Sequence, residues 1–132
     1  MIARYARAPM KALWTEENRL GIMTEVEVLA AEALAKKKII PYKAARSIRR
    51  KASCSPERIR QIEQVTNHDV IAFLTDLSEH IGPDARYLHF GLTSSDVLDT
   101  ALAVQMKESC DILIADVKRL RVVLRQKARR YK

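Results

Sequence analysis

The sequence predicts an all-α fold, and three observations support this prediction. Aromatic residues, which favour strands, make up only 5% of the 132 residues, and three glycines with four prolines leave few tight hairpin turns. Apolar residues recur at spacings of three and four along several segments, which is the period of a helix buried on one face. Polar capping residues precede these segments. Because 48% of the residues are hydrophobic, the chain can bury one core, and we expect a small helical domain followed by a long helix.

The first long helix is predicted to follow an irregular N-terminal segment. Residues 2–10 are expected to be irregular, because Pro9 would block an early helix. Thr15 is predicted to cap a helix that ends near Lys37, with Trp14 in the core and Glu17, Arg19, Glu25 and Glu32 in solvent. The predicted apolar stripe of this helix comprises Leu20, Met23, Val26, Val28, Leu29, Ala33 and Leu34.

Three shorter helical segments are predicted next. One occupies Tyr42 to about Ala52, and Ser55-Pro56 is an N-cap and first-turn signal for another, from Glu57 to about Gln64. A polar stop at residues 66–69 precedes a fourth helix, whose apolar face includes Val70, Ile71, Phe73, Leu74 and Leu77. His80 lies beside Gly82-Pro83 at the end of that helix, where a structural role is expected.

The last helix is predicted to be longer than the domain that carries it. Ser94 or Ser95 is expected to be its cap and Asp96 to lie in its first turn, where the helix dipole favours negative charge. Some 34 residues would span about 50 Å, whereas a compact chain of this size has a diameter of about 36 Å. The apolar stripe of the overhanging part therefore needs partners from other chains or from missing sequence.

The charge distribution argues against a nucleic-acid-binding protein. Residues 117–132 contain eight basic side chains and no acidic one, while the remaining 116 residues carry sixteen of each sign, so the net charge of +8 is terminal. No recognition-helix motif or interleaved aromatic residues accompany the basic clusters. The sequence has no apolar run of about 18 residues, so no membrane span is expected. Cys54 and Cys110 lack metal-ligand spacing and are predicted to be reduced thiols of a cytoplasmic protein.

The best candidates for binding or catalytic residues lie in the segment 87–100, YLHFGLTSSDVLDT. A histidine, a glycine, hydroxyls and an acid precede a helix there, and free backbone N–H groups at such a turn can bind a carboxylate or a phosphate. The alternative is that Thr93, Ser94 and Ser95 only cap the helix. A serine hydrolase is not expected, because the segment lacks a Gly-x-Ser elbow.

Several motifs resemble bacterial adenylosuccinate lyases, a family of the fumarase and argininosuccinate lyase superfamily. Residues 89–102, HFGLTSSDVLDTAL, resemble one segment of this family, and TNHDV at 66–70 resembles its His-Asp motif. The opening MIARY, the helix start LWTEEN at 13–18 and the turn EHIGP at 79–83 are also similar, so the resemblance extends over essentially the whole chain.

This resemblance implies a fumarase/aspartase-like fold. It implies that residues 1–93 form a helical N-terminal domain and residues 94–132 the first long helix of a truncated helical-bundle domain, which assembles as a homotetramer. It also implies a cytoplasmic enzyme of AMP and purine biosynthesis that needs no cofactor or metal and binds neither nucleic acid nor membrane. The implied reaction is β-elimination of fumarate from adenylosuccinate, giving AMP, and from the succinyl-carboxamide ribotide of de novo purine synthesis, giving AICAR.

The resemblance also implies roles for particular residues. Arg4 and Tyr5 would contact the nucleotide's phosphate and ribose, and their side chains suit these groups. Thr93 and Ser94 would bind the succinyl carboxylate, with His89 near the substrate. The segment Asn67, His68 and Asp69 would line the nucleotide site, with His68 supporting catalysis by positioning the substrate; many family members have Arg or Lys where this chain has Asn67.

We expect Arg4, His68 and Thr93 to reach one small molecule. Family active sites draw residues from three subunits, and the family's general acid and general base lie on sequence absent here, so the fragment is expected to be inactive alone. Two alternatives remain: a cycloisomerase of the same superfamily, which has a similar Thr-Ser motif, and a non-catalytic helical assembly module.

Overall fold

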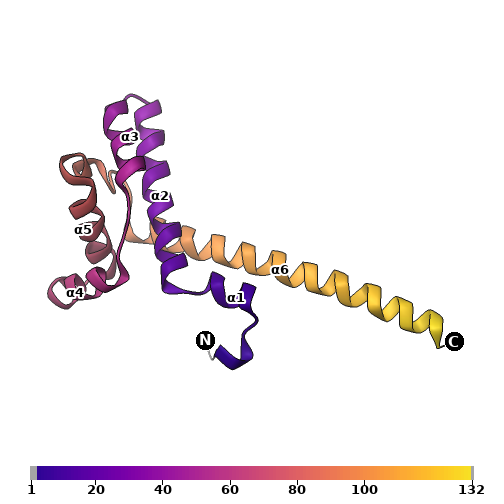
Figure 1. Ribbon diagram of the computed structural model, residues 1–132. Coiled ribbons are helices and arrows are strands. Elements are labelled where there is room, and N and C mark those ends of the chain that lie inside the picture. Colours follow the sequence, from indigo (N-terminus) through magenta and orange to yellow (C-terminus); the bar gives the residue numbers. More distant parts are fainter. Residues whose placement is uncertain (1–2, 132) are drawn as a thin grey trace.

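The computed structural model describes residues 3–131, and the described part consists of helices and connecting loops (Figure 1). The all-α prediction is therefore confirmed. Predictions that involve Met1, Ile2 and Lys132 lie outside the described residues. The elements in chain order are η1 (Ala3–Tyr5), α1 (Ala8–Leu13), α2 (Glu16–Lys36), α3 (Tyr42–Lys51), α4 (Pro56–Thr66), α5 (Asp69–Ile81), η2 (Gly82–Tyr87) and α6 (Ser94–Arg130).

The core lies where α2, α3, α5 and the beginning of α6 meet (Figure 1). Large side chains from these helices are almost completely buried there, and burying each one contributes about 1.5–3 kcal/mol of hydrophobic free energy. Because Val97 and Ala101 belong to this core, the first turns of α6 are fixed to the preceding helices. A domain boundary at residue 93 stays a prediction. The largest fully buried apolar side chains of this core are Met23, Ile48, Phe73, Leu77, Ile81 and Val97.

Most helix boundaries agree with the sequence. The Thr15 hydroxyl accepts a hydrogen bond from the Asn18 backbone N–H at 3.2 Å, as expected for the cap of α2. Ser55 caps α4 with Pro56 in its first turn, and α4 ends at Thr66, two residues beyond the predicted end. These boundaries were predictable because each depends on a short-range contact.

The prediction of an irregular N-terminus was wrong for α1. Pro9 lies in the first turn of this helix, where backbone N–H groups have no partner within the helix, so the missing N–H of proline costs nothing. The structure places α1 against the middle of α6. Gln105 donates to the Leu13 carbonyl at 2.7 Å, and Arg7 pairs with Asp116.

Three side chains assigned to the core of the first helices are exposed. Trp14 is 40% exposed, and its indole nitrogen donates to the Ser109 hydroxyl at 3.0 Å. Leu29 and Ala33 also face solvent, while Glu27 is buried. The buried face of α2 is therefore rotated from the predicted one, because it follows residues 20, 23, 27, 28, 31 and 35.

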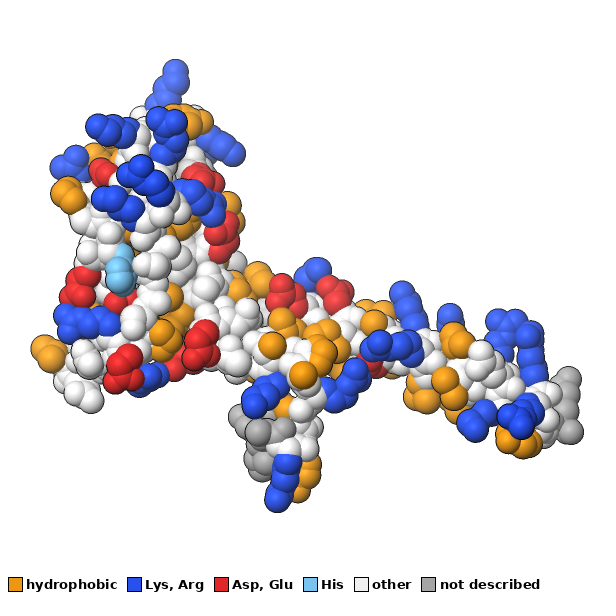
Figure 2. Space-filling model, in the orientation of Figure 1, with side chains coloured by type: hydrophobic (Ala, Val, Ile, Leu, Met, Phe, Trp, Pro, Cys, Tyr) orange, Lys and Arg blue, Asp and Glu red, His pale blue; other side chains and the backbone are white. Residues whose placement is uncertain are grey.

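The C-terminal part of α6 projects from the domain, as predicted (Figure 1). Its 37 residues correspond to about 55 Å. Apolar side chains along the projecting part are about half exposed and alternate with basic ones (Figure 2). Within residues 3–131, no helix has the length and apolarity needed to cross a membrane. The exposed apolar residues of this part include Leu113, Ile114, Val117, Leu120, Val122, Val123 and Leu124.

Candidate functional site

The N-terminus of α6 is closed by a capping box. Thr93 is the N-cap, so the expectation that Ser94 or Ser95 caps the helix was wrong. The Thr93 backbone N–H donates to Asp96 Oδ2 at 2.7 Å, the Thr93 hydroxyl donates to the same atom at 2.8 Å, and the Asp96 N–H donates to that hydroxyl at 3.3 Å. The backbone and side-chain hydrogen bonds from Thr93, with a smaller contribution from the charge of His89, lower the pKa of Asp96.

The two serines after the cap keep unused hydrogen-bonding groups. Their backbone N–H groups are in the first turn, where no intrahelical acceptor is available. Among the described residues, neither the Ser94 nor the Ser95 hydroxyl makes a hydrogen bond, and Ser94 is half-buried. Capping alone thus accounts for Thr93, whereas Ser94 retains groups that could bind an anion.

His89 is held by a buried carboxylate that sequence reasoning missed. Glu27, on α2, has a completely buried side chain. Its Oε2 accepts the His89 backbone N–H at 2.8 Å, and its Oε1 lies 2.6 Å from His89 Nδ1. The signal was present in the sequence, because Glu27 continues the apolar spacing of Leu20 and Met23.

The segment Asn67, His68 and Asp69 joins α4 to α5. Asn67 has a φ of 51°, the left-handed conformation that terminates α4, and Asn adopts it more readily than most residues. His68 is the N-cap of α5, since its Nδ1 accepts the Ile71 N–H at 3.3 Å. Nδ1 is therefore unprotonated, which leaves the proton on Nε2 as a donor. Asp69 Oδ1 accepts the Val70 N–H at 2.8 Å.

Arg4 and Tyr5 lie far from the α6 N-terminus of the same chain. Both are exposed on η1, with the Arg4 guanidinium 4.8 Å from the centre of the Tyr5 ring. Tyr5 lines a hollow of about 200 Å³ together with Ile112 of α6. Thr93 and Ile112 are nineteen positions apart on α6, which corresponds to about 28 Å. The structure therefore does not bring Arg4 and Tyr5 to Thr93 within one chain.

A hollow of about 620 Å³ lies between the beginnings of α2 and α5 and the first turns of α6. Of the predicted site residues it includes only Asp69. Its other charged lining residues are Glu16, Arg19 and Asp99, so carboxylates outnumber the single guanidinium and disfavour an anionic ligand. The hollow does show that the α5 N-terminus, which carries His68, lies beside α6.

The structure thus places His89 and the Thr93 capping box on one short segment, and it places Asp69 beside the first turns of α6. His89 begins the turn that leads to the Thr93 capping box, where the Leu92 N–H donates to the His89 carbonyl at 3.3 Å. Asp69 shares a hollow with Asp99, three positions after Asp96. Hydrogen-bond donors, a histidine ring and a helix N-terminus can stabilise a carboxylate on which charge develops. Among residues 3–131, no group of three His, Cys, Asp or Glu side chains is placed to hold a metal ion.

Comparisons with known proteins identify the family of this chain. A family model described as "Lyase" matches residues 3–132. The chain is 44% identical over all 132 residues to an adenylosuccinate lyase of Bacillus subtilis (strain 168), and it spans about 31% of that relative's length.

Two solved structures have the same arrangement of helices. One is a 3-carboxy-cis,cis-muconate lactonizing enzyme from Pseudomonas putida, with a TM-score of 0.84 and 26% identity over 96% of this chain and 30% of that one. The other is a fumarate lyase from Mesorhizobium sp. BNC1, with a TM-score of 0.75 and 29% identity over 83% of this chain and 26% of that one.

Proposed function

We propose a function for this chain from the premise that it belongs to the lyase family, whose model matches residues 3–132. It contributes substrate-binding and positioning residues to the active site of an adenylosuccinate lyase. The 44% identity over the whole chain to the Bacillus subtilis enzyme supports this choice within the family. The observation that carries it is the α6 N-terminus, where free N–H groups and the Ser94 hydroxyl follow the turn that begins at His89 and can receive a carboxylate.

The proposed reaction cleaves a carbon–nitrogen bond of adenylosuccinate. A base removes the proton from the succinyl carbon next to the carboxylate, the electron pair forms the double bond of fumarate, and the purine amine of AMP leaves with a proton from an acid. Negative charge accumulates on the carboxylate during proton removal, so preorganised donors lower the barrier. The same elimination would act on the succinyl-carboxamide ribotide and give AICAR.

The described residues can supply binding and positioning. The Ser94 hydroxyl and the first-turn amides of α6 would donate to the succinyl carboxylate. Thr93 would join them only by exchanging its hydrogen bond to Asp96 for one to the ligand. His68 would donate from Nε2 to the substrate near the reacting bond, and Asn67 would offer an uncharged amide where many relatives have a cation.

A complete site needs more than one copy of this chain. Arg4 and Tyr5 would bind phosphate and ribose, yet Tyr5 lies beside Ile112, about 28 Å along α6 from Thr93 of the same chain. They would therefore serve a site formed with another subunit. The half-exposed apolar face of α6 is suited to this assembly, which we propose to be a homotetramer in the cytoplasm.

The general acid and general base of the reaction would lie on sequence beyond these 132 residues. This chain spans about 31% of its relative's length, so we expect negligible lyase activity from it alone. Fumarate release by the purified chain, at a rate near that of a full-length relative, would contradict this expectation.

The cycloisomerase alternative is supported by one observation, the structural similarity to the Pseudomonas lactonizing enzyme. The two functions differ in their ligands, because Arg4 and Tyr5 together suit the phosphate and ribose of a nucleotide, whereas a small dicarboxylate has no ribose for Tyr5 to contact. Calorimetry on a full-length protein carrying this chain, with AMP and with a muconate-type dicarboxylate, separates them. Binding of AMP supports the lyase, whereas binding of the dicarboxylate alone would favour the cycloisomerase. Binding of neither would favour the helical assembly module.

A further inference from the structure

We propose that Glu27 is a positioning residue for the substrate site, because it fixes both the backbone and the ring of His89. This inference rests on the proposed function, in which His89 faces the substrate, and extends it to a residue outside the predicted motifs. Glu27 comes from the middle of α2, 62 positions before His89, so the contact joins two elements that are distant in the sequence.

The backbone of His89 needs external support. Its φ is 56°, in the left-handed region that a side chain with a Cβ disfavours. Glu27 Oε2 accepts the His89 N–H at 2.8 Å, which stabilises this conformation. Gly91, with a φ of 77°, then completes the reversal toward Thr93. The orientation of the loop between η2 and α6 therefore depends on a carboxylate of α2.

The ring of His89 is fixed by the second oxygen. Glu27 Oε1 lies 2.6 Å from His89 Nδ1, and we infer that Nδ1 donates to this oxygen, because a carboxylate oxygen accepts hydrogen bonds. The opposite nitrogen, Nε2, is left to contact a ligand. The ring is 23% exposed whereas the Glu27 side chain is completely buried, so Glu27 acts on a ligand only through His89. This is the usual arrangement in which a second residue sets the tautomer of a working histidine.

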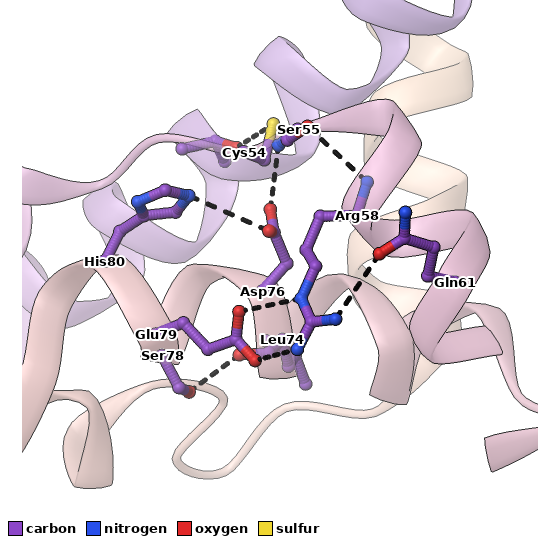
Figure 3. A network of polar contacts seen from close by, with 10 residues as sticks. Cys54, Ser55, Arg58, Gln61, Leu74, Asp76, Ser78, Glu79 and His80 are labelled. Carbon is purple, nitrogen blue, oxygen red and sulfur yellow. Dashed lines mark hydrogen bonds and ion pairs between the residues drawn. The ribbon is translucent and has the colours of Figure 1, made fainter. Parts of the chain in front are cut away.

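The chain contains a matched control for this contact, shown in Figure 3. Asp76 of α5 is also completely buried, and it accepts a backbone N–H from Ser55 at 2.8 Å. Its other oxygen lies 3.7 Å from His80 Nε2. Asp76 is therefore a buried carboxylate with a backbone donor and a nearby histidine, but its second oxygen has no hydrogen-bond partner among the described residues, and it lies outside the proposed site.

The first test measures the ring directly and does not depend on activity. Nitrogen-15 NMR of the 132-residue chain reports which nitrogen of each histidine carries the proton. We expect His89 to be protonated at Nδ1 in the wild type and to change its nitrogen shifts in Glu27→Gln, because an amide offers one acceptor oxygen where the carboxylate offers two. Asp76→Asn should leave the His89 shifts unchanged. A wild-type His89 with a free Nδ1 would overturn the proposal even if no variant folds.

The second test measures the reaction in a full-length protein that carries this chain. Glu27→Gln is expected to lower kcat/KM for adenylosuccinate about tenfold to a hundredfold, the range found for residues that orient a functional histidine. It should also shift the pH profile of kcat/KM. Glu27→Asp should recover part of the loss, since it keeps the charge with a shorter reach. In a His89→Asn background, Glu27→Gln should have little further effect.

The outcomes separate this proposal from the proposed function. Wild-type kinetics retained in Glu27→Gln, or an equal loss in Asp76→Asn, would overturn the role of Glu27 while leaving the lyase assignment intact. A wild-type protein that does not cleave adenylosuccinate would refute the lyase assignment, and the NMR measurement would still decide whether Glu27 sets the state of His89.

Discussion

Replacing Thr93 with alanine tests whether the capping box holds the start of α6. The change removes the hydroxyl that accepts the Asp96 N–H and donates to Asp96 Oδ2. Loss of a threonine N-cap lowers the free energy of unfolding by about 1 kcal/mol, within a range of about 0.5–2 kcal/mol. For a chain of this size, that corresponds to a decrease of about 3–5 °C in Tm. The lost stability should appear in the unfolding of the whole chain, because Val97, four positions after Thr93, is buried in the core.

Urea unfolding of the 132-residue chain, followed by circular dichroism, measures this difference. Thr93→Ser keeps the hydroxyl and should remain within a few tenths of a kcal/mol of the wild type. Ser95→Ala removes a hydroxyl without a hydrogen bond among the described residues and should change the stability by less than about 0.5 kcal/mol. If Thr93→Ala were no more destabilising than Ser95→Ala, the capping box would contribute nothing and the reasoning would fail.

The same variant should respond differently to acid. The Thr93 backbone N–H and hydroxyl lower the pKa of Asp96, so the stabilisation from the ionised carboxylate is present above the ordinary aspartate pKa of about 3.9 and is lost as the pH falls below it. Thr93→Ala keeps the backbone hydrogen bond and loses the one from the hydroxyl. We expect a smaller loss of stability on acidification in this variant than in the wild type, and an identical loss would contradict the assignment.

Two further predictions concern residues near the site and in the core. Asn67→Lys should lower the free energy of unfolding, measured in urea, by about 1 kcal/mol, because Asn67 has a positive φ that lysine disfavours. Asn67→Gly should remain close to the wild type, because glycine adopts this conformation readily. Equal stability of all three proteins would contradict this explanation. Burial raises the pKa of the Cys54 thiol, so iodoacetamide at pH 8 should modify the exposed Cys110 first. Mass spectrometry of the partly labelled chain measures the two rates. Modification of Cys54 at the same rate as Cys110 would refute this prediction.

The sequence predicted those parts of the fold that depend on neighbouring residues. Thr15 and Ser55 mark the beginnings of α2 and α4 because capping acts over three or four positions, and Asp69 lies in the first turn of α5. Pro9 was misread because the same residue ends a helix in its interior and is tolerated in its first turn, and only the packing of α1 on α6 decides between the two.

The candidate site was less predictable, because it depends on contacts across long sequence separations. Glu27 was assigned no role, since its partner His89 is 62 positions away. Thr93, Ser94 and Ser95 are all good capping residues, and the chain path through the left-handed His89 and Gly91 determines which of them becomes the cap. Tyr5 is separated from Thr93 because it packs beside Ile112, far along α6. No local sequence pattern indicates where along α6 the N-terminal segment packs.

The proposed site is tested most directly by fumarate release from adenylosuccinate by a full-length protein carrying this chain, compared with its Ser94→Ala variant. We expect the wild type to form fumarate and AMP in equal amounts. Ser94→Ala should lower kcat/KM at least about tenfold, because a hydrogen bond to a charged group contributes about 1.5–3 kcal/mol. Absence of fumarate from the wild type, or unchanged kinetics in Ser94→Ala, would contradict the claim that the α6 N-terminus receives the succinyl carboxylate.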